Sequence, residues 1–133
     1  MKTPIHSPKA PRPLGPYSQA IGIGGLVFFS GQIAVNFATG EVVGDDIAAQ
    51  TRRALTNLGA VIEAAAMTYD DIVKTTVFLT EIEEYFEAFN TVYSTFFPNT
   101  PPARTTVGVN ALPRGSMVMI DAVGVRAVVQ RTS

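Results

Sequence analysis

Residues 72–96, IVKTTVFLTEIEEYFEAFNTVYSTF, decide the fold of this chain, because the spacing of their apolar residues changes midway. The stretch from Ile72 to Leu79 is short and rich in β-branched residues, which predicts a buried strand. From Ile82 to Phe96 a broad apolar stripe recurs at helical spacing, and Thr80 and Glu83 have the spacing of a capping box. We therefore expect a strand followed directly by a helix whose aromatic stripe belongs to the core.

The segments before this centre predict a hairpin and a first helix. Residues 17–23 and 26–35 have the composition of strands, and Gly24-Gly25 between them suits a tight turn. From Asp45 to about Ala66, apolar residues recur at helical spacing, with acidic residues at the positive N-terminal end. After the proline-rich stretch 98–102, residues 105–110 and 116–129 predict two more strands.

The expected order is ββαβαββ, which indicates the α+β class and a mixed sheet with both helices on one face. At 133 residues the chain fits a single domain, 1–133, whose first 14 residues form an extended, proline-rich arm. Apolar residues alternate on both faces of the last predicted strand, but two helices cover only one face of a sheet. The other face is therefore expected to be buried against further copies of the chain.

Composition excludes several kinds of site. The net charge is −1 and the Lys and Arg residues are scattered, so no nucleic-acid partner is expected. The chain has no cysteine, and its one histidine, His6, lies in the arm, which leaves no expected metal site or cofactor. No signal peptide or membrane-spanning run is present, so the expected location is cytoplasmic, with no membrane partner.

Three positions are candidates for a site. Arg104 follows two prolines and precedes a strand, where its planar fork suits a carboxylate; a surface or salt-bridged arginine is the alternative. The run Ser30-Gly31-Gln32 interrupts an apolar strand, where a backbone N–H can approach a ligand, or where the strand has only a β-bulge. Asn90 is the third candidate, because it lies beside the aromatic stripe. The alternative interpretation is that its amide is exposed or hydrogen-bonded locally.

Several stretches resemble the signature of the YjgF/YER057c/UK114 family of reactive intermediate deaminases, in order and at the family's spacing, from about residue 8 to 128. They are Gly15-Pro16-Tyr17, Ser30-Gly31-Gln32, Thr39-Gly40-Glu41-Val42, Gln50-Thr51-Arg52, residues 71–78, Asn90-Thr91-Val92-Tyr93 and Pro102-Ala103-Arg104. The Pro-Ala-Arg motif followed by a strand is the most specific of them.

The resemblance implies a chorismate mutase-like fold and a homotrimer with three clefts, each built from two chains. It implies that Arg104 binds the carboxylate of the substrate and that Tyr17, Ser30, Gly31 and Asn90 line the same cleft. Thr106 replaces a common cysteine, and its backbone amide is expected to donate to the substrate. The implied reaction converts 2-imino acids or their enamine tautomers to 2-keto acids and ammonia, without a cofactor.

One motif departs from the family. Where the family has a water-activating glutamate in a strand reading Ile-Glu-Ile-Glu-Ala, this chain has Met119 within Val118-Met119-Ile120-Asp121-Ala122. A thioether accepts no proton at neutral pH, so Asp121, Tyr17 or an ordered water chain would replace the base, with Arg104 and Ser30 completing the catalytic set. Asp121 lies two residues on, hence on the same face and about 7 Å away.

Met119 is also assigned to the substrate-binding residues and motivates a second hypothesis. In this alternative the chain is a non-catalytic trimer that binds small carboxylates such as 2-keto acids and serves as a sensor or regulator. A third possibility, ribonuclease or translation-inhibitor activity, is disfavoured by the net acidity of the chain.

Overall fold

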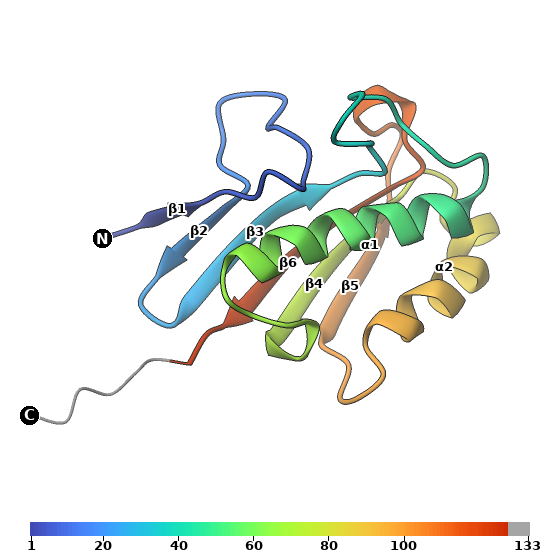
Figure 1. Ribbon diagram of the computed structural model, residues 1–133. Helices are drawn as coiled ribbons and strands as arrows, with labels where there is room; N and C mark the ends of the chain where they lie inside the picture. Colours follow the sequence, from blue (N-terminus) through green and yellow to red (C-terminus); the bar gives the residue numbers. More distant parts are fainter. Residues whose placement is uncertain (128–133) are drawn as a thin grey trace, which may run out of the picture.

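The computed structural model describes residues 1–127, which form a six-stranded mixed sheet with two helices on one face (Figure 1). In chain order the elements are β1 (Thr3–Ile5), β2 (Ala20–Ile23), β3 (Leu26–Gln32), α1 (Ile47–Ala64), a 3₁₀ turn (Tyr69–Asp71), β4 (Ile72–Leu79), α2 (Ile82–Phe96), β5 (Ala103–Gly108), a second 3₁₀ turn (Pro113–Gly115) and β6 (Val118–Val125). Apart from β1, this is the predicted ββαβαββ order.

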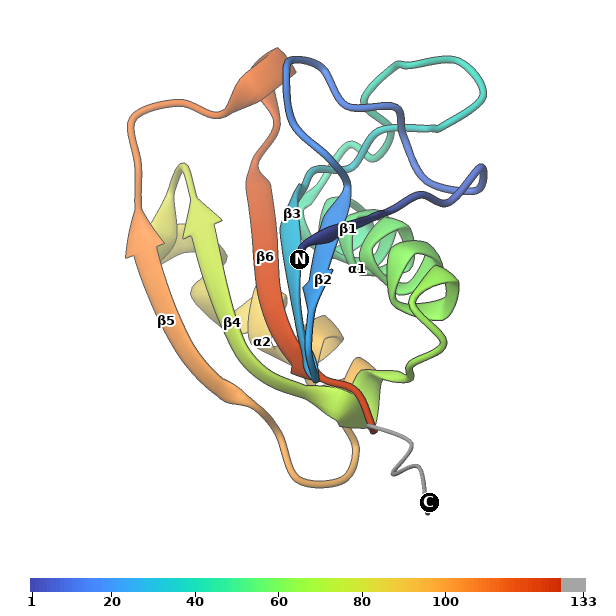
Figure 2. The same cartoon turned by 90° about the vertical axis from the view of Figure 1, so that its left-hand side faces the viewer.

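The strands lie in the order β1-β2-β3-β6-β4-β5. Among the described residues, β4 and β5 pair in parallel and every other neighbouring pair is antiparallel. The parallel pair is joined through α2, since parallel neighbours need a crossover connection. Both helices lie on the same side of the twisted sheet (Figure 2). This arrangement leaves β5 as one edge and the opposite face of the sheet without a helix.

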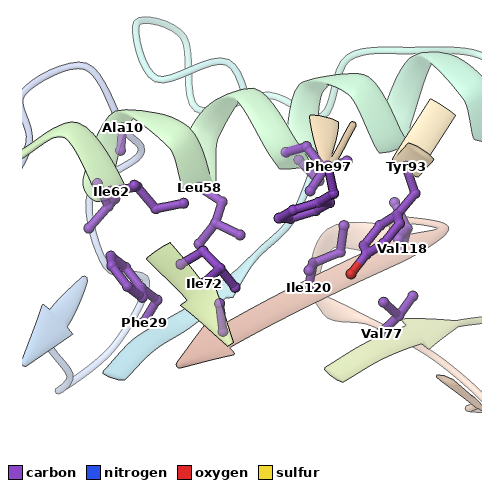
Figure 3. Packing of buried hydrophobic residues seen from close by; sticks show 14 of the residues in the cluster. Ala10, Phe29, Leu58, Ile62, Ile72, Val77, Tyr93, Phe97, Val118 and Ile120 are labelled. Atoms are coloured by element: carbon purple, nitrogen blue, oxygen red, sulfur yellow. The ribbon is translucent and has the colours of Figure 1, made fainter. Parts of the chain in front are cut away.

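The core lies between the helices and the sheet (Figure 3). Val77, Val118 and Ile120 on the sheet and Leu58 on α1 are fully buried. Phe89 and Tyr93 of α2 join the same cluster, as the aromatic stripe predicted.

The two helices begin differently. Asp46 caps α1, because its Oδ1 accepts a hydrogen bond from the Ala49 backbone N–H at 2.8 Å. The predicted capping box of α2 is wrong, since the helix begins after Glu81 without a side-chain cap. Thr80 instead donates its backbone N–H to the Met117 carbonyl and so continues the sheet.

The N-terminal arm contains a strand that was not predicted. β1 pairs with β2, and the rest of the arm is held by Gln19, which is 3% exposed. The Oε1 of Gln19 accepts from the Ser7 N–H at 2.6 Å, and its Nε2 donates to the Ser7 and Pro11 carbonyls at 3.2 and 3.0 Å. One buried amide therefore satisfies backbone groups that the prolines keep out of a sheet.

Strand ends differ from the predictions where backbone groups find other partners. The predicted strands 17–23 and 26–35 are shorter, and they meet at a turn in which Gly24 has φ +57°. The register of β3 shifts between Phe29 and Gln32, so the β-bulge that was the alternative interpretation of this run is present. The predicted strands 105–110 and 116–129 run over 103–108 and 118–125, and residues 128 and 129 lie outside the described part of the chain.

The sheet face without helices is apolar. Leu26 and Phe28 of β3 pair with Val125 and Val123 of β6, and three of these side chains, with Val73 of β4, are 42–47% exposed. The prediction of a last strand apolar on both faces is thus confirmed for residues 118–125.

Candidate functional site

Arg104 lies in the edge strand β5 with its guanidinium against α2. Its Nη2 donates a hydrogen bond to the Asn90 Oδ1 at 2.8 Å. Its Cζ lies 4.8 Å from the centre of the Tyr93 ring, 5.3 Å from Phe89 and 5.7 Å from Phe86. Three aromatic rings and one amide therefore hold the guanidinium in place. We call this arrangement, Arg104 with Phe86, Phe89, Asn90 and Tyr93, the arginine cage.

The cage follows from helical and strand spacing. Its α2 residues lie at positions 86, 89, 90 and 93, which fall on one face of a helix. In β5, Arg104 pairs with the fully buried Thr75 of β4, so its side chain points to the side that α2 covers. Phe86 corrects the prediction that the whole aromatic stripe is core, because its ring is 40% exposed.

The electrostatics of the cage favour an anion. The bond to Asn90 uses one of five guanidinium donors, and a neutral amide leaves the positive charge uncompensated. Burial raises the pKa of Tyr93, although its hydrogen bond with Thr75 and the Arg104 charge oppose that shift, so the phenol is neutral at pH 7. A carboxylate is the natural partner for the remaining N–H groups.

Thr106 lies two residues after Arg104, on the same side of β5, and pairs with Val77. Because β5 is an edge strand, backbone groups along its outer side lack a sheet partner within the described residues. The predicted backbone donation from Thr106 to a ligand is therefore compatible with its position.

A second group of predicted site residues lies near the C-terminal end of β3 and consists of Tyr17, Ser30 and Gly31. The Tyr17 hydroxyl accepts a hydrogen bond from the Leu14 N–H at 3.0 Å, and its ring is 49% exposed. Ser30 donates its hydroxyl proton to the Ser18 carbonyl at 2.6 Å. These bonds commit the Ser30 proton to the backbone and leave the Tyr17 proton free to donate.

Met119 of β6 belongs to this second group. A Cβ built on Gly31 would lie 2.9 Å from both Cγ and Sδ of Met119, so the thioether occupies the space above the glycine. Asp121 lies on the same face of β6, where its Oδ1 accepts from the Thr76 N–H at 3.1 Å and its second oxygen makes no hydrogen bond to the described residues. The prediction that Met119 and Asp121 lie on the same face of one strand is thereby confirmed.

One chain does not bring the two groups together. β6 and β4 lie between β3 and β5, which at the usual strand spacing places them about 14 Å apart. Arg104 also points to the helix side, whereas Met119 lies on the face without helices. The predicted cleft built from two chains fits this separation, and the assembly itself stays a prediction.

The second group opens into a cavity of about 150 Å³ between the arm and the segment after β3. Its lining includes Tyr17 and Gly31, which were predicted, and Gln32, which belongs to the candidate run 30–32. Arg12 and Asn36 also line it and were not singled out as site residues. The sequence feature that points to Gln32 is its polar amide in an otherwise apolar strand.

The remaining candidates give no site. His6 is exposed just after β1, and among residues 1–127 no three His, Cys, Asp or Glu side chains are grouped so as to hold a metal ion. In the part of the chain that the structure describes, neither helix is long and apolar enough to cross a membrane.

The sequence pattern of the family described as Endoribonuclease L-PSP matches residues 7–126. The chain belongs to this family, the YjgF/UK114 proteins. A RutC family protein of Saccharolobus solfataricus is 47% identical over 123 residues, covering 92% of this chain and 97% of the relative. A 2-iminobutanoate/2-iminopropanoate deaminase of Dermatophagoides farinae is 42% identical over 119 residues, covering 90% and 92%.

Solved structures of this YjgF/UK114 family share the fold. The YjgF gene product of E. coli superposes with a TM-score of 0.88 at 42% identity, covering 94% of this chain and 99% of that one. TdcF of E. coli, solved with bound serine, gives 0.89 at 39% identity with the same coverage. The predicted family and the chorismate mutase-like α+β fold are thereby confirmed.

Proposed function

We propose that this protein hydrolyses 2-imino acids or their enamine tautomers to 2-keto acids and ammonia, in clefts between the subunits of a homotrimer. The arginine cage carries the proposal, because it presents an oriented, uncompensated guanidinium beside the open edge of β5. A relative 42% identical to this chain is a deaminase for such imines, and TdcF binds serine, a small molecule with a carboxylate.

The reaction needs positioning more than strong catalytic groups. Arg104 would pair with the substrate carboxylate, which fixes the adjacent C=N group beside a water molecule. Attack by the water forms a C–O bond at C2 while the π electrons move to nitrogen. Both protons of the added water then pass to that nitrogen, the first giving a carbinolamine and the second an ammonium leaving group, and ammonia leaves as the C–N bond breaks and the keto group forms. The free Asp121 oxygen or the Tyr17 hydroxyl would carry protons, since Met119 has none to exchange.

Met119 favours a second candidate, a trimer that binds 2-keto acids without turning them over. Its thioether packs on Gly31 where the family has a carboxylate, so the cleft would hold a ligand but activate no water. RNA cleavage, which the family's description names, has weaker support, because the net charge is −1 and the one histidine is exposed in the arm.

The test measures ammonia and keto acid released from 2-aminoacrylate, generated in place by a dehydratase, with and without the protein. We expect acceleration that Arg104→Ala reduces at least tenfold, since a charge-assisted hydrogen bond contributes about 1.5–3 kcal/mol. Arg104→Lys should not restore it, because an ammonium lacks the planar fork. The matched control is Arg52→Ala on the exposed side of α1, which should behave as wild type.

Calorimetry with 2-ketobutyrate separates the two candidates. Binding that needs Arg104 without any acceleration would favour the non-catalytic trimer. Acceleration that Met119→Glu increases further would support a deaminase working with an impaired base. Acceleration that Arg104→Ala leaves unchanged would contradict both.

A further inference from the structure

The cavity beside Tyr17 has apolar walls and a polar interior. Pro11, Pro13, Ile33 and Val35 line it from the arm and from the segment after β3. Its volume of about 150 Å³ resembles that of cavities that hold benzene, so it admits about six non-hydrogen atoms. No Asp or Glu is among its lining residues.

The polar groups in the cavity have donors to spare. Gln32 is 7% exposed, and within residues 1–127 no hydrogen bond involves its side-chain amide. Asn36 uses its Oδ1 to accept from the Ala38 and Thr39 N–H groups, which leaves its Nδ2 free to donate. The Tyr17 oxygen accepts from the Leu14 N–H, which leaves its own proton available.

Arg12 adds a positive charge to these donors. Its side chain is exposed and lines the same cavity. The free donors of Gln32, Asn36 and Tyr17 would all be satisfied by a group able to accept several hydrogen bonds. A carboxylate accepts from all four side chains and also pairs with the guanidinium, so it fits better than an amide, a hydroxyl or a methyl group.

We propose that this cavity is a subsite for the second carboxylate of a dicarboxylic substrate, a five-carbon 2-imino or 2-keto diacid. The proposal rests on the proposed function, in which Arg104 of a neighbouring copy holds the first carboxylate. Tyr17 and Gly31 line the cavity and belong to the predicted cleft, so the side chain of a substrate held there faces the cavity. Two methylenes and a carboxylate amount to five non-hydrogen atoms, which the volume admits.

The test compares ligands that differ at one end. Calorimetry on the full chain measures 2-ketoglutarate against 2-oxovalerate, in which a methyl group replaces the second carboxylate, and against 2-ketobutyrate. We expect 2-ketoglutarate to bind at least tenfold more tightly than 2-oxovalerate. Arg12→Ala should remove that preference without changing the affinity for 2-oxovalerate, and Arg52→Ala should change neither. Gln32→Glu should reverse the preference, because it places a second negative charge in the cavity.

The outcomes separate the two proposals. Equal affinities for the diacid and the monoacids, all lost with Arg104→Ala, would overturn the subsite and leave the proposed function standing. A diacid preference that survives both Arg12→Ala and Gln32→Glu would also overturn the subsite. If no ligand binds through Arg104, the proposed function fails and the subsite with it. Should Gln32→Glu fail to fold, the exposed Arg12 decides the result.

Discussion

Gly31 and Met119 show how one residue restricts another across neighbouring strands. The glycine has no φ requirement here, so its lack of a side chain matters only because the Met119 thioether fills the space above it. This packing replaces a charged group by an apolar surface at the predicted cleft. The chemistry available to the second group of residues thus depends on this contact.

At this scale we predict that Gly31→Ala lowers stability by about 1–2 kcal/mol, because the added methyl group overlaps Met119 Cγ and Sδ. Thermal unfolding at fixed protein concentration measures the effect. In a Met119→Ala background the same substitution should cost little, since the two changes share one contact. Equal costs in both backgrounds would show that the overlap is not the cause.

At the scale of elements, Tyr69 joins the turn before β4 to α1. Its hydroxyl donates to the Leu55 carbonyl at 2.7 Å, and its ring packs edge-on against Phe96 and Phe97. A Cβ on Gly59 would overlap that hydroxyl, so the helix needs a glycine at this position. One phenol therefore connects both helices to the start of a central strand.

Burial raises the pKa of Tyr69 from 10.0 to about 12. Between these values the folded chain keeps a proton that the unfolded chain has lost, so stability falls as pH rises from about 10 to 12. We predict a steeper fall for the wild type than for Tyr69→Phe, measured by urea unfolding at pH 8, 10 and 11. Parallel pH profiles would mean that the phenol is not protected in the folded state.

At the scale of the whole molecule, the uncovered sheet face and the open β5 edge are the surfaces that the proposed trimer would bury. The two groups of predicted site residues belong to different strands and opposite faces. The exposed side chains of Leu26, Phe28, Val73 and Val125 form a patch that a monomer would leave in water. In the proposed trimer, a partner chain covers this patch and contributes one side of each proposed cleft.

We predict that Phe28→Asp, which places a charge in this patch, dissociates the assembly to a 14.2 kDa chain and abolishes 2-ketobutyrate binding. Light scattering after size exclusion gives the mass, and calorimetry gives the binding. Thr56→Asp adds the same charge on the exposed side of α1 and should change neither. A monomeric wild type, or a Phe28→Asp protein of unchanged mass, would contradict the trimer.

Local patterns predicted some parts of the site and missed others. Arg104 stood out because two prolines precede it and a strand follows it, and Asn90 because it lies beside an apolar stripe. The bond between them depends on the parallel pairing of β4 with β5, which no local pattern contains. The strand β1 was missed for the same reason, because it forms only by pairing with β2, which lies about 17 residues further along the chain.

The sequence by itself determined the class of fold, the order of its elements apart from β1, and the acidic residues at the start of α1, since periodicity and charge placement are local properties of the chain. Only the tertiary structure decided that three rings surround Arg104, that Met119 covers Gly31 and that Gln32 faces a cavity. Those contacts join residues far apart in the chain, and their geometry depends on strand register and helix placement, which single residues do not specify.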